Sequence, residues 1–331
     1  MVIPVAIYNR NQGEPFTDYF VRLFEHKDEY GLCCDEIAVL LNDEQGTDYG
    51  ESKWRKDYAM FSKGRAYERS LRDGSIANRI LCLSDFHVPF QLPVETFADY
   101  AGRVDTLVLS GDIGDCQSLS KFPKAYRVSP MEELIETRSY LITLIDYIKP
   151  KKVVVLYGNH DIRFQSYLAK NLDSDILELM PQTSLELIFV DGFKHYDKRL
   201  LAKVSYPALK DVIEDVEIDY IGNWHTQIGD TIFCHPIAFS GGIMKTAEKA
   251  MGYFRNEGSD FSTLVLAHTH RIGSYKMGDT MLYEQGCCCD VNKLHYGDGK
   301  LTPSQKEGFI YFGQDINGHT IASSVELVAL N

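Results

Sequence analysis

Three short polar clusters each follow directly on an apolar run, and their side chains are of types that bind metal ions. The clusters are Asp85-Phe86-His87 after residues 81–84, Gly111-Asp112-Ile113-Gly114-Asp115 after residues 106–110, and Gly158-Asn159-His160-Asp161 after residues 153–157. Each apolar run is typical of a buried strand, so each cluster is expected in the loop past a strand's carboxyl end. Open α/β sheets bind their ligands there because the loops converge on one crevice.

Three further histidines follow two later apolar runs. His235 comes after residues 231–234, and His268 and His270 come after residues 264–267. A lone histidine is more often an ordinary polar residue than a ligand, but five clusters at five expected strand ends favour one shared site. Hard oxygen donors mixed with imidazole suit Mn, Fe or Zn.

This combination resembles the calcineurin-like metallophosphoesterase superfamily, in its nuclease and phosphodiesterase branch. The pattern of that superfamily is D-x-H, G-D-x-x-D, G-N-H-D/E, a later H, and G-H-x-H. The first three motifs match in full, and the last departs only in having Ala267 at the usual glycine, over residues 79–290 or about two thirds of the chain. The resemblance implies two divalent ions, manganese first, with iron, zinc, nickel or magnesium as alternatives. It implies that one ion is held by Asp85, His87 and His270, the other by Asn159, His235 and His268, and that Asp112 bridges them.

The implied chemistry is hydrolysis of a phosphate ester. Two divalent ions about 3.5–4 Å apart lower the pKa of a shared water, orient it in line with phosphorus and neutralise the phosphoryl oxygens. The nucleophile is then a metal-bridging hydroxide. The resemblance further implies that His160 is not a ligand but protonates the leaving oxygen or steadies the transition state, and that Asp115 holds the other ring nitrogen of His160. The alternative for Asp115 is a structural role, in which its carboxylate accepts hydrogen bonds from main-chain amides of the turn.

The composition bounds the protein class. The chain of 331 residues is long enough for one large α/β domain and a small one. No apolar run approaches the roughly 18 residues that cross a bilayer, so we expect no membrane partner. Residues 1–7 are apolar but lack the basic start and small-residue cleavage pattern of a signal peptide. We therefore expect a cytoplasmic protein whose eight cysteines are reduced.

The order of apolar patterns predicts the fold. Strands at the three clusters alternate with helices at residues 93–102 and 131–149, and crossovers of that length require parallel strands. A helix is expected over residues 161–180, a hairpin carrying His235, and short strands over residues 308–330 that finish a second sheet. The predicted class is α/β: a four-layer, two-sheet β-sandwich flanked by helices in residues 76–331, preceded by a small helical domain in residues 1–75.

The cysteines include a run of three at Cys287, Cys288 and Cys289. Adjacent cysteines cannot easily bridge each other, and no C-x-x-C pair occurs in the chain. Packing in the core or a loop is the simpler interpretation. The alternative is a thiol near the metals, because members of the family often have a turn there facing the site.

The amino-terminal residues predict three short helices, after Pro15, over residues 35–41 and over residues 52–63, which look like a helix-turn-helix module with a long link. The chain has a net charge of −13, yet residues 51–73 carry seven basic and four acidic side chains. Lys53, Arg55 and Lys56 are therefore candidate contacts to a nucleic-acid backbone. A solvated helix face, or one docking on the acidic body, explains the same charges.

We expect a metal-dependent phosphoesterase that acts on phosphodiesters in nucleic acid. Asp161 follows Asn159-His160, Asp115 is not followed by the Arg-Gly common in protein phosphatases, and a basic helical module precedes the catalytic domain. A phosphomonoesterase, a protein phosphatase and a small cyclic-nucleotide phosphodiesterase remain as alternatives. The remaining alternative is a non-catalytic DNA-binding regulator with a degenerate phosphoesterase fold. Loss of catalysis would be expected to remove metal ligands first, whereas here the set of ligand residues is complete.

Overall fold

The computed structural model describes residues 8–120, 128–294 and 305–330, and the side chains of these except residues 66–74. The apolar residues 1–7 and the side chains of Arg69 and Arg72, which contribute to the local positive charge, lie outside this description. Two compact units divide the chain, Met1–Gly74 and Ser75–Asn331. No helix in the described part of the chain is both long and apolar enough to span a membrane.

The amino-terminal unit is helical, as predicted. Its helices are α1 (Phe16–Glu25), α2 (Lys27–Tyr30), α3 (Cys34–Gln45) and α4 (Glu51–Ser75). Leu23, Ile37, Leu41 and Trp54 are buried together and form its core. The helix predicted over residues 52–63 is too short, because α4 continues to Ser75 through a polar stretch that gives little apolar periodicity.

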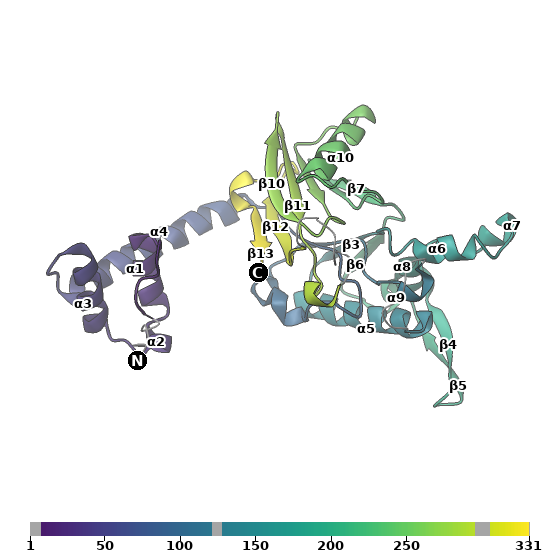
Figure 1. Ribbon diagram of the computed structural model, residues 1–331, viewed down its shortest axis with the longest axis horizontal. Helices are drawn as coiled ribbons and strands as arrows, with labels where there is room; N and C mark the ends of the chain where they lie inside the picture. Colours follow the sequence, from purple (N-terminus) through teal and green to yellow (C-terminus); the bar gives the residue numbers. More distant parts are fainter. Residues whose placement is uncertain (1–7, 121–127, 295–304, 331) are drawn as a thin grey trace. The chain divides into compact units, whose positions relative to one another are not determined.

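The larger unit contains two main sheets and a small hairpin (Figure 1). The first sheet has the order β13-β12-β1-β2-β3-β6. Its strands are β1 (Asn78–Leu83), β2 (Thr106–Ser110), β3 (Lys152–Leu156), β6 (Glu217–Tyr220), β12 (Gly308–Gln314) and β13 (Glu326–Ala329). Strands β1, β2, β3 and β6 are parallel neighbours, whereas β12 pairs antiparallel with β1.

The second sheet has the order β10-β11-β9-β8-β7. Its strands are β7 (His225–Ile228), β8 (Thr231–Cys234), β9 (Thr263–Leu266), β10 (Ile272–Met277) and β11 (Thr280–Gln285). Strands β8, β9 and β11 are parallel, so their carboxyl ends lie at one edge. A separate hairpin is formed by β4 (Phe193–Asp197) and β5 (Ala202–Tyr206).

Alternating side chains along the parallel strands create the layers. In β1, Leu81 and Leu83 pack with helix α5 (Pro130–Ile148) on one face of the first sheet. Ile80 and Cys82 point to the other face and pack against residues of the second sheet. Helix α10 (Lys245–Asn256) covers the outer face of that second sheet through Phe254 and its neighbours. The order helix, sheet, sheet, helix confirms the predicted four-layer α/β sandwich.

Three sequence-based predictions of local structure need correction. The strands in residues 308–330 complete the first sheet rather than the second, because β12 pairs with β1. Residues 93–102 contain a 3₁₀ helix, Val94–Tyr100, kinked at Phe97. The long helix expected over residues 161–180 is instead two short ones, α6 (Arg163–Leu168) and α7 (Ser174–Leu177). The chain between them turns at Asp173, whose extended backbone begins α7.

The remaining short helices are α8 (Ser184–Glu186), a π-helical turn at Leu187–Asp191, and α9 (Leu209–Val212). Short 3₁₀ turns lie at Gln117–Leu119, Val291–Lys293 and Ala322–Ser324. These segments connect the strands without contributing side chains to the predicted metal ligands.

Candidate metal centre

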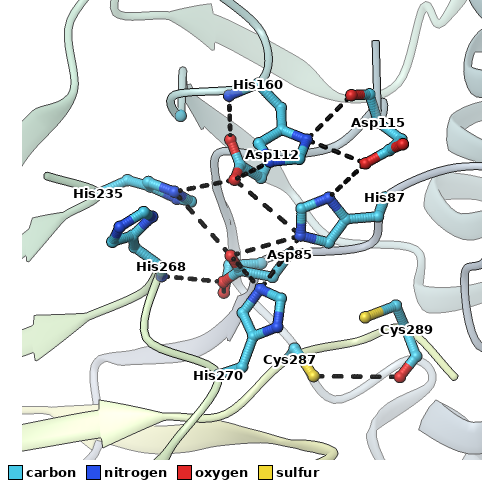
Figure 2. Close-up of polar contacts among 12 residues, drawn as sticks. Asp85, His87, Asp112, Asp115, His160, His235, His268, His270, Cys287 and Cys289 are labelled. Carbon is cyan, nitrogen blue, oxygen red and sulfur yellow. Dashed lines mark hydrogen bonds and ion pairs between the residues drawn. The ribbon is translucent and has the colours of Figure 1, made fainter. Parts of the chain in front are cut away.

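All the predicted metal ligands come from loops at the carboxyl ends of β1, β2, β3, β8 and β9. Strands β1 to β3 belong to the first sheet, and β8 and β9 belong to the second, so the two sheets present their loops to one another (Figure 2). The structure therefore brings together side chains that are up to 185 positions apart in the sequence.

One group of side chains consists of Asp85, His87 and His270, whose ligand atoms lie within 4.8 Å of one another. His270 Nε2 is 3.1 Å from Asp85 Oδ1 and 3.1 Å from His87 Nε2. Two imidazole nitrogens and a carboxylate oxygen thus converge on one point. This is the donor set expected for a divalent ion of the first transition row.

A second group consists of Asp112, His235 and His268, again with ligand atoms within 4.8 Å of one another. His235 Nε2 lies 3.3 Å from Asp112 Oδ2. Asn159 Oδ1, His235 Nε2 and His268 Nε2 are buried atoms with no hydrogen-bond partner among the described residues. Buried polar atoms are normally paired, so the unsatisfied nitrogens of His235 and His268, which belong to one group, fit a cation that they would share, and Asn159 Oδ1 is a further unsatisfied acceptor in the loop after β3.

Asp112 lies between the two groups. Its Oδ2 atom is 3.3 Å from His235 Nε2 and 4.0 Å from His87 Nε2, so it faces one histidine of each group. Its Oδ1 atom accepts the main-chain N–H of His160 at 2.7 Å. The Asp161 carboxylate accepts the amides of Asp112 and Gly158, both at 2.8 Å, and so ties the second loop to the third.

Hydrogen bonds outside the two groups orient their histidines. His235 Nδ1 donates to the Ser110 carbonyl at 2.7 Å, which turns Nε2 toward Asp112. His270 Nδ1 pairs with Gln305 Oε1 at 2.8 Å. Partners of this kind hold a ligand ring in place and raise its basicity.

The backbone of these loops is unusual. Asp85, His87, Asp112, His268 and His270 all have positive φ, between 47° and 80°. Residues other than glycine rarely adopt this conformation, and they cluster at functional sites when they do.

The loops after β2 and β3 are also in direct main-chain contact. A Cβ atom on Gly158 would lie 2.2 Å from Asp112 Oδ1, and one on Gly111 would lie 2.5 Å from Gly158 N. The glycines of both motifs are therefore required by close approach rather than by the turn alone.

The electrostatics of the site favour positive charge. Burial would raise the pKa of Asp112, but His235 and His160 nearby hold it well below its usual range. Burial would lower the pKa of His235 and His270, yet the charges of Asp112 and Asp85 raise them to about 9 and about 10 respectively. By contrast, burial and the neighbouring His235 lower the pKa of His268 to about 4. The carboxylates thus attract protons or, in their place, metal ions.

His160 is buried beside this cluster, with a ring nitrogen within 4.8 Å of ligand atoms of His87 and Asp112. Its Nδ1 atom is 3.0 Å from Asp115 Oδ1 and 2.9 Å from the Asp115 carbonyl oxygen. The same carboxylate oxygen is 3.3 Å from His87 Nδ1. Asp115 therefore contacts both a proposed metal ligand, His87, and the proposed acid, His160. Burial would raise the pKa of Asp115, but hydrogen bonds from His160 and His87 hold it well below its usual range.

Arg163 is a site residue that the sequence patterns did not single out. Its guanidinium donates to the Asp115 carbonyl at 2.7 Å and to His160 Nε2 at 2.8 Å. Because a guanidinium can only donate, His160 Nε2 is the acceptor of this bond, and Nδ1 faces Asp115. The only signal in the sequence was the position of an arginine three residues after His160, in the turn that starts α6.

The three basic candidates of the amino-terminal unit lie on the exposed surface of α4. Lys53 forms an ion pair with Asp57, and Arg55 lies 3.7 Å from Glu51, both within the helix. Lys56 is also exposed. These residues belong to the other compact unit.

Comparison with known proteins identifies both parts of the chain. The family model described as calcineurin-like phosphoesterase matches residues 78–271. The model of the YonJ N-terminal domain matches residues 5–72. The SPbeta prophage-derived uncharacterized protein YonJ of Bacillus subtilis is 36% identical over 75 residues, which are 23% of this chain and 18% of that protein. The chain therefore spans less than a fifth of the curated relative that it matches.

Solved structures with distant similarity include an archaeal phosphodiesterase and a metallophosphoesterase from Sphaerobacter thermophilus. The first is 15% identical, with 76% of this chain and 99% of that chain covered and a TM-score of 0.33. The second is 17% identical, with 73% and 88% covered and a TM-score of 0.33. Because the phosphoesterase model spans more than half of the sequence, including the loops that converge in Figure 2, this chain belongs to the calcineurin-like phosphoesterase family.

Proposed function

We propose that the chain hydrolyses phosphodiester bonds in nucleic acid with two divalent ions, of which manganese is the first candidate. The observation that carries the dinuclear part is the pair of ligand groups joined by Asp112, one of which contains the buried and unsatisfied Nε2 atoms of His235 and His268. Asp85, His87 and His270 would hold one ion, and Asn159, His235 and His268 the other. When bound, the ions activate water and offset negative charge on the phosphoryl group.

The protein's own part in the reaction is positioning and proton transfer. Asp112, with Oδ2 facing both groups, sets the distance between them. His160 stands beside Asp112, with its Nε2 atom 3.9 Å from Asp112 Oδ2, where it would face a phosphate held between the two groups. Asp115 keeps the Nδ1 side of the ring fixed through a 3.0 Å contact. His160 then assists the leaving oxygen from Nε2.

Arg163 controls when His160 can donate a proton to the leaving oxygen. With the guanidinium donating to Nε2, the ring cannot donate from that atom. We propose that an incoming phosphate attracts the partly exposed guanidinium to its own oxygens, a geometry that arginine recognises well. His160 Nε2 is then free to take a proton from solvent water and pass it to the leaving oxygen as the P–O bond breaks, while the proton lost by the attacking water returns to solvent. Arg163 thereby couples substrate binding to the protonation of His160 Nε2.

Support for nucleic acid as the substrate comes from the amino-terminal unit. Residues 51–73 carry a net charge of +3 in a chain of −13. The pairs that Lys53 and Arg55 form are exposed, and exposed pairs of this kind contribute little energy, so both cations can exchange their partners for phosphates. Removing such cations should lower the number of counterions released on binding.

Two substrate comparisons test this proposal. Bis-p-nitrophenyl phosphate should be hydrolysed faster than p-nitrophenyl phosphate in the presence of Mn²⁺, and labelled single- or double-stranded DNA should be cut. Asp112→Asn, prepared in parallel, controls for contaminating enzymes. A clear preference for the monoester, with DNA left intact, would contradict the phosphodiester assignment and favour a phosphomonoesterase. Absence of any metal-dependent turnover would contradict the proposal as a whole.

A further inference from the structure

Beside the proposed metal centre, the loop that follows strand β11 carries three consecutive cysteines. Cys287, Cys289 and a ring nitrogen of His270 place their ligand atoms within 4.8 Å of one another, and all three residues are buried (Figure 2). The two thiols pack in one small cluster with Leu294, whereas Cys288 between them packs in the main core. The alternation of an extended chain thus turns two of the three thiols toward the same side.

The main chain holds this arrangement in place. The Lys306 amide donates to the His270 carbonyl at 2.8 Å, and the Cys287 amide donates to the Lys306 carbonyl at 3.0 Å. Lys306 therefore links the loop that carries His270 to the loop that carries the three cysteines. The Cys288 amide donates to the Ser84 carbonyl at 2.9 Å, immediately before the ligand loop of β1. The thiols are fixed to the same loops that carry the proposed metal ligands.

We propose that Cys287, Cys289 and His270 form a third metal site, which adjoins the dinuclear centre, shares His270 with it and is selective for thiophilic cations such as Zn²⁺ or Cd²⁺. Two sulfurs and one imidazole are the donor set that such ions prefer over the oxygen-rich set of the dinuclear centre. Ligand atoms around a tetrahedral zinc lie roughly 3.3–3.8 Å apart, so small side-chain rotations suffice. Three protein ligands leave one position for water or for Gln305, whose Oε1 is 2.8 Å from His270 Nδ1.

The shared histidine gives the site a consequence for activity. His270 Nε2 lies 3.1 Å from Asp85 Oδ1, in the first ligand group of the dinuclear centre. A thiophilic ion that draws the imidazole toward the two sulfurs weakens that group, so excess zinc should inhibit the manganese enzyme. This inhibitory effect rests on the proposed function, whereas metal binding by the thiols does not.

Binding is tested with Co²⁺ and Cd²⁺, whose thiolate complexes give charge-transfer absorption that nitrogen and oxygen ligands do not give. The full chain should carry Cys33→Ser and Cys34→Ser, because these two thiols are exposed or partly exposed and would add background. Cys287→Ser with Cys289→Ser is compared with Cys288→Ser, which removes an equally buried thiol that packs in the main core instead. We expect about one equivalent of charge-transfer signal in the parent and in Cys288→Ser, and its loss in the double variant.

Two results would overturn the third site: a folded parent without the signal, or a double variant that keeps it. If the double variant does not fold, X-ray absorption of the cadmium-loaded parent decides, since the proposal requires two sulfur neighbours and none would refute it. Zinc inhibition is measured against each protein's own Mn²⁺-dependent activity. Equal inhibition of the double variant and Cys288→Ser would refute the link through His270, while the charge-transfer result stands independently of whether phosphodiesters are the substrate.

Discussion

Replacement of Glu133 by glutamine should make the protein more stable at alkaline pH. Glu133 lies on α5 with only 4% of its surface exposed, and its Oε1 atom accepts the amide of Cys116, next to Asp115. Burial, reinforced by the charge of Asp115, raises the pKa of Glu133 from 4.5 to about 8. The folded protein therefore holds this proton more tightly than the unfolded chain does.

The sign and size follow from proton linkage. The contribution of this group to stability is fully present below pH 4.5, falls as pH rises, and is lost above pH 8. One pKa unit corresponds to about 1.4 kcal/mol, so the total loss is at most about 5 kcal/mol. Glutamine keeps the acceptor oxygen but does not ionise. Glu133→Gln should thus match the wild type within about 1 kcal/mol near pH 4.5 and exceed it by roughly 2–4 kcal/mol at pH 9.

The measurement is urea unfolding of both proteins across this pH range, with chelator present so that metal binding does not add a pH dependence. Other titrating groups, such as Asp161, cancel in the difference between the two proteins. Glu136→Gln, exposed and one turn away on α5, is the matched control and should show no such trend. If the difference between Glu133→Gln and wild type stays constant from pH 4.5 to 9, the buried charge is not what limits stability.

Three further predictions concern the proposed site. Asp112→Asn should lower the content of both metals together and abolish hydrolysis; metal analysis showing two ions per chain with near-normal turnover would exclude it as the bridge. His160→Asn should keep both metals but slow hydrolysis of an ester with a poor leaving group by roughly 10²–10⁴-fold, and much less with p-nitrophenolate. Equal losses on both substrates would argue against an acid role. Replacing Lys53, Arg55 and Lys56 by alanine should weaken DNA binding at every sequence and flatten its dependence on salt between about 50 and 200 mM. An unchanged slope of affinity against salt concentration would mean that these residues only form a solvated helix face.

The parts of the fold that were predictable are those in which apolar runs precede polar clusters. The strands before Asp85, Asp112 and Asn159 are buried on both faces, so their runs are unbroken and easily recognised. The pairing of β12 with β1 was not predictable, because the paired positions are 228 to 236 residues apart in the sequence and the pattern of β12 fits either sheet. Partners so distant leave no local mark on the sequence.

The site was predictable to a similar extent. Residue types and spacing pointed to the ligand clusters, since few other arrangements place carboxylates and imidazoles after five strands. Arg163 was missed because its role depends on a contact with His160 that only the folded turn creates. The thiols at 287–289 were expected to be buried, and they are, but their spacing could not indicate that two of them face His270.

The left-handed backbone at five of the proposed ligands lowers the stability of the fold at the positions that the proposed activity requires. Each such conformation costs a residue other than glycine roughly 1–2 kcal/mol, whereas glycine adopts it freely. Glycine at Asp85, His87, Asp112, His268 or His270 would therefore relax a strained loop while deleting a donor atom. A screen of variants of this chain for heat resistance alone would be drawn toward inactive proteins, so engineering for robustness must hold these five positions constant and find its gains elsewhere.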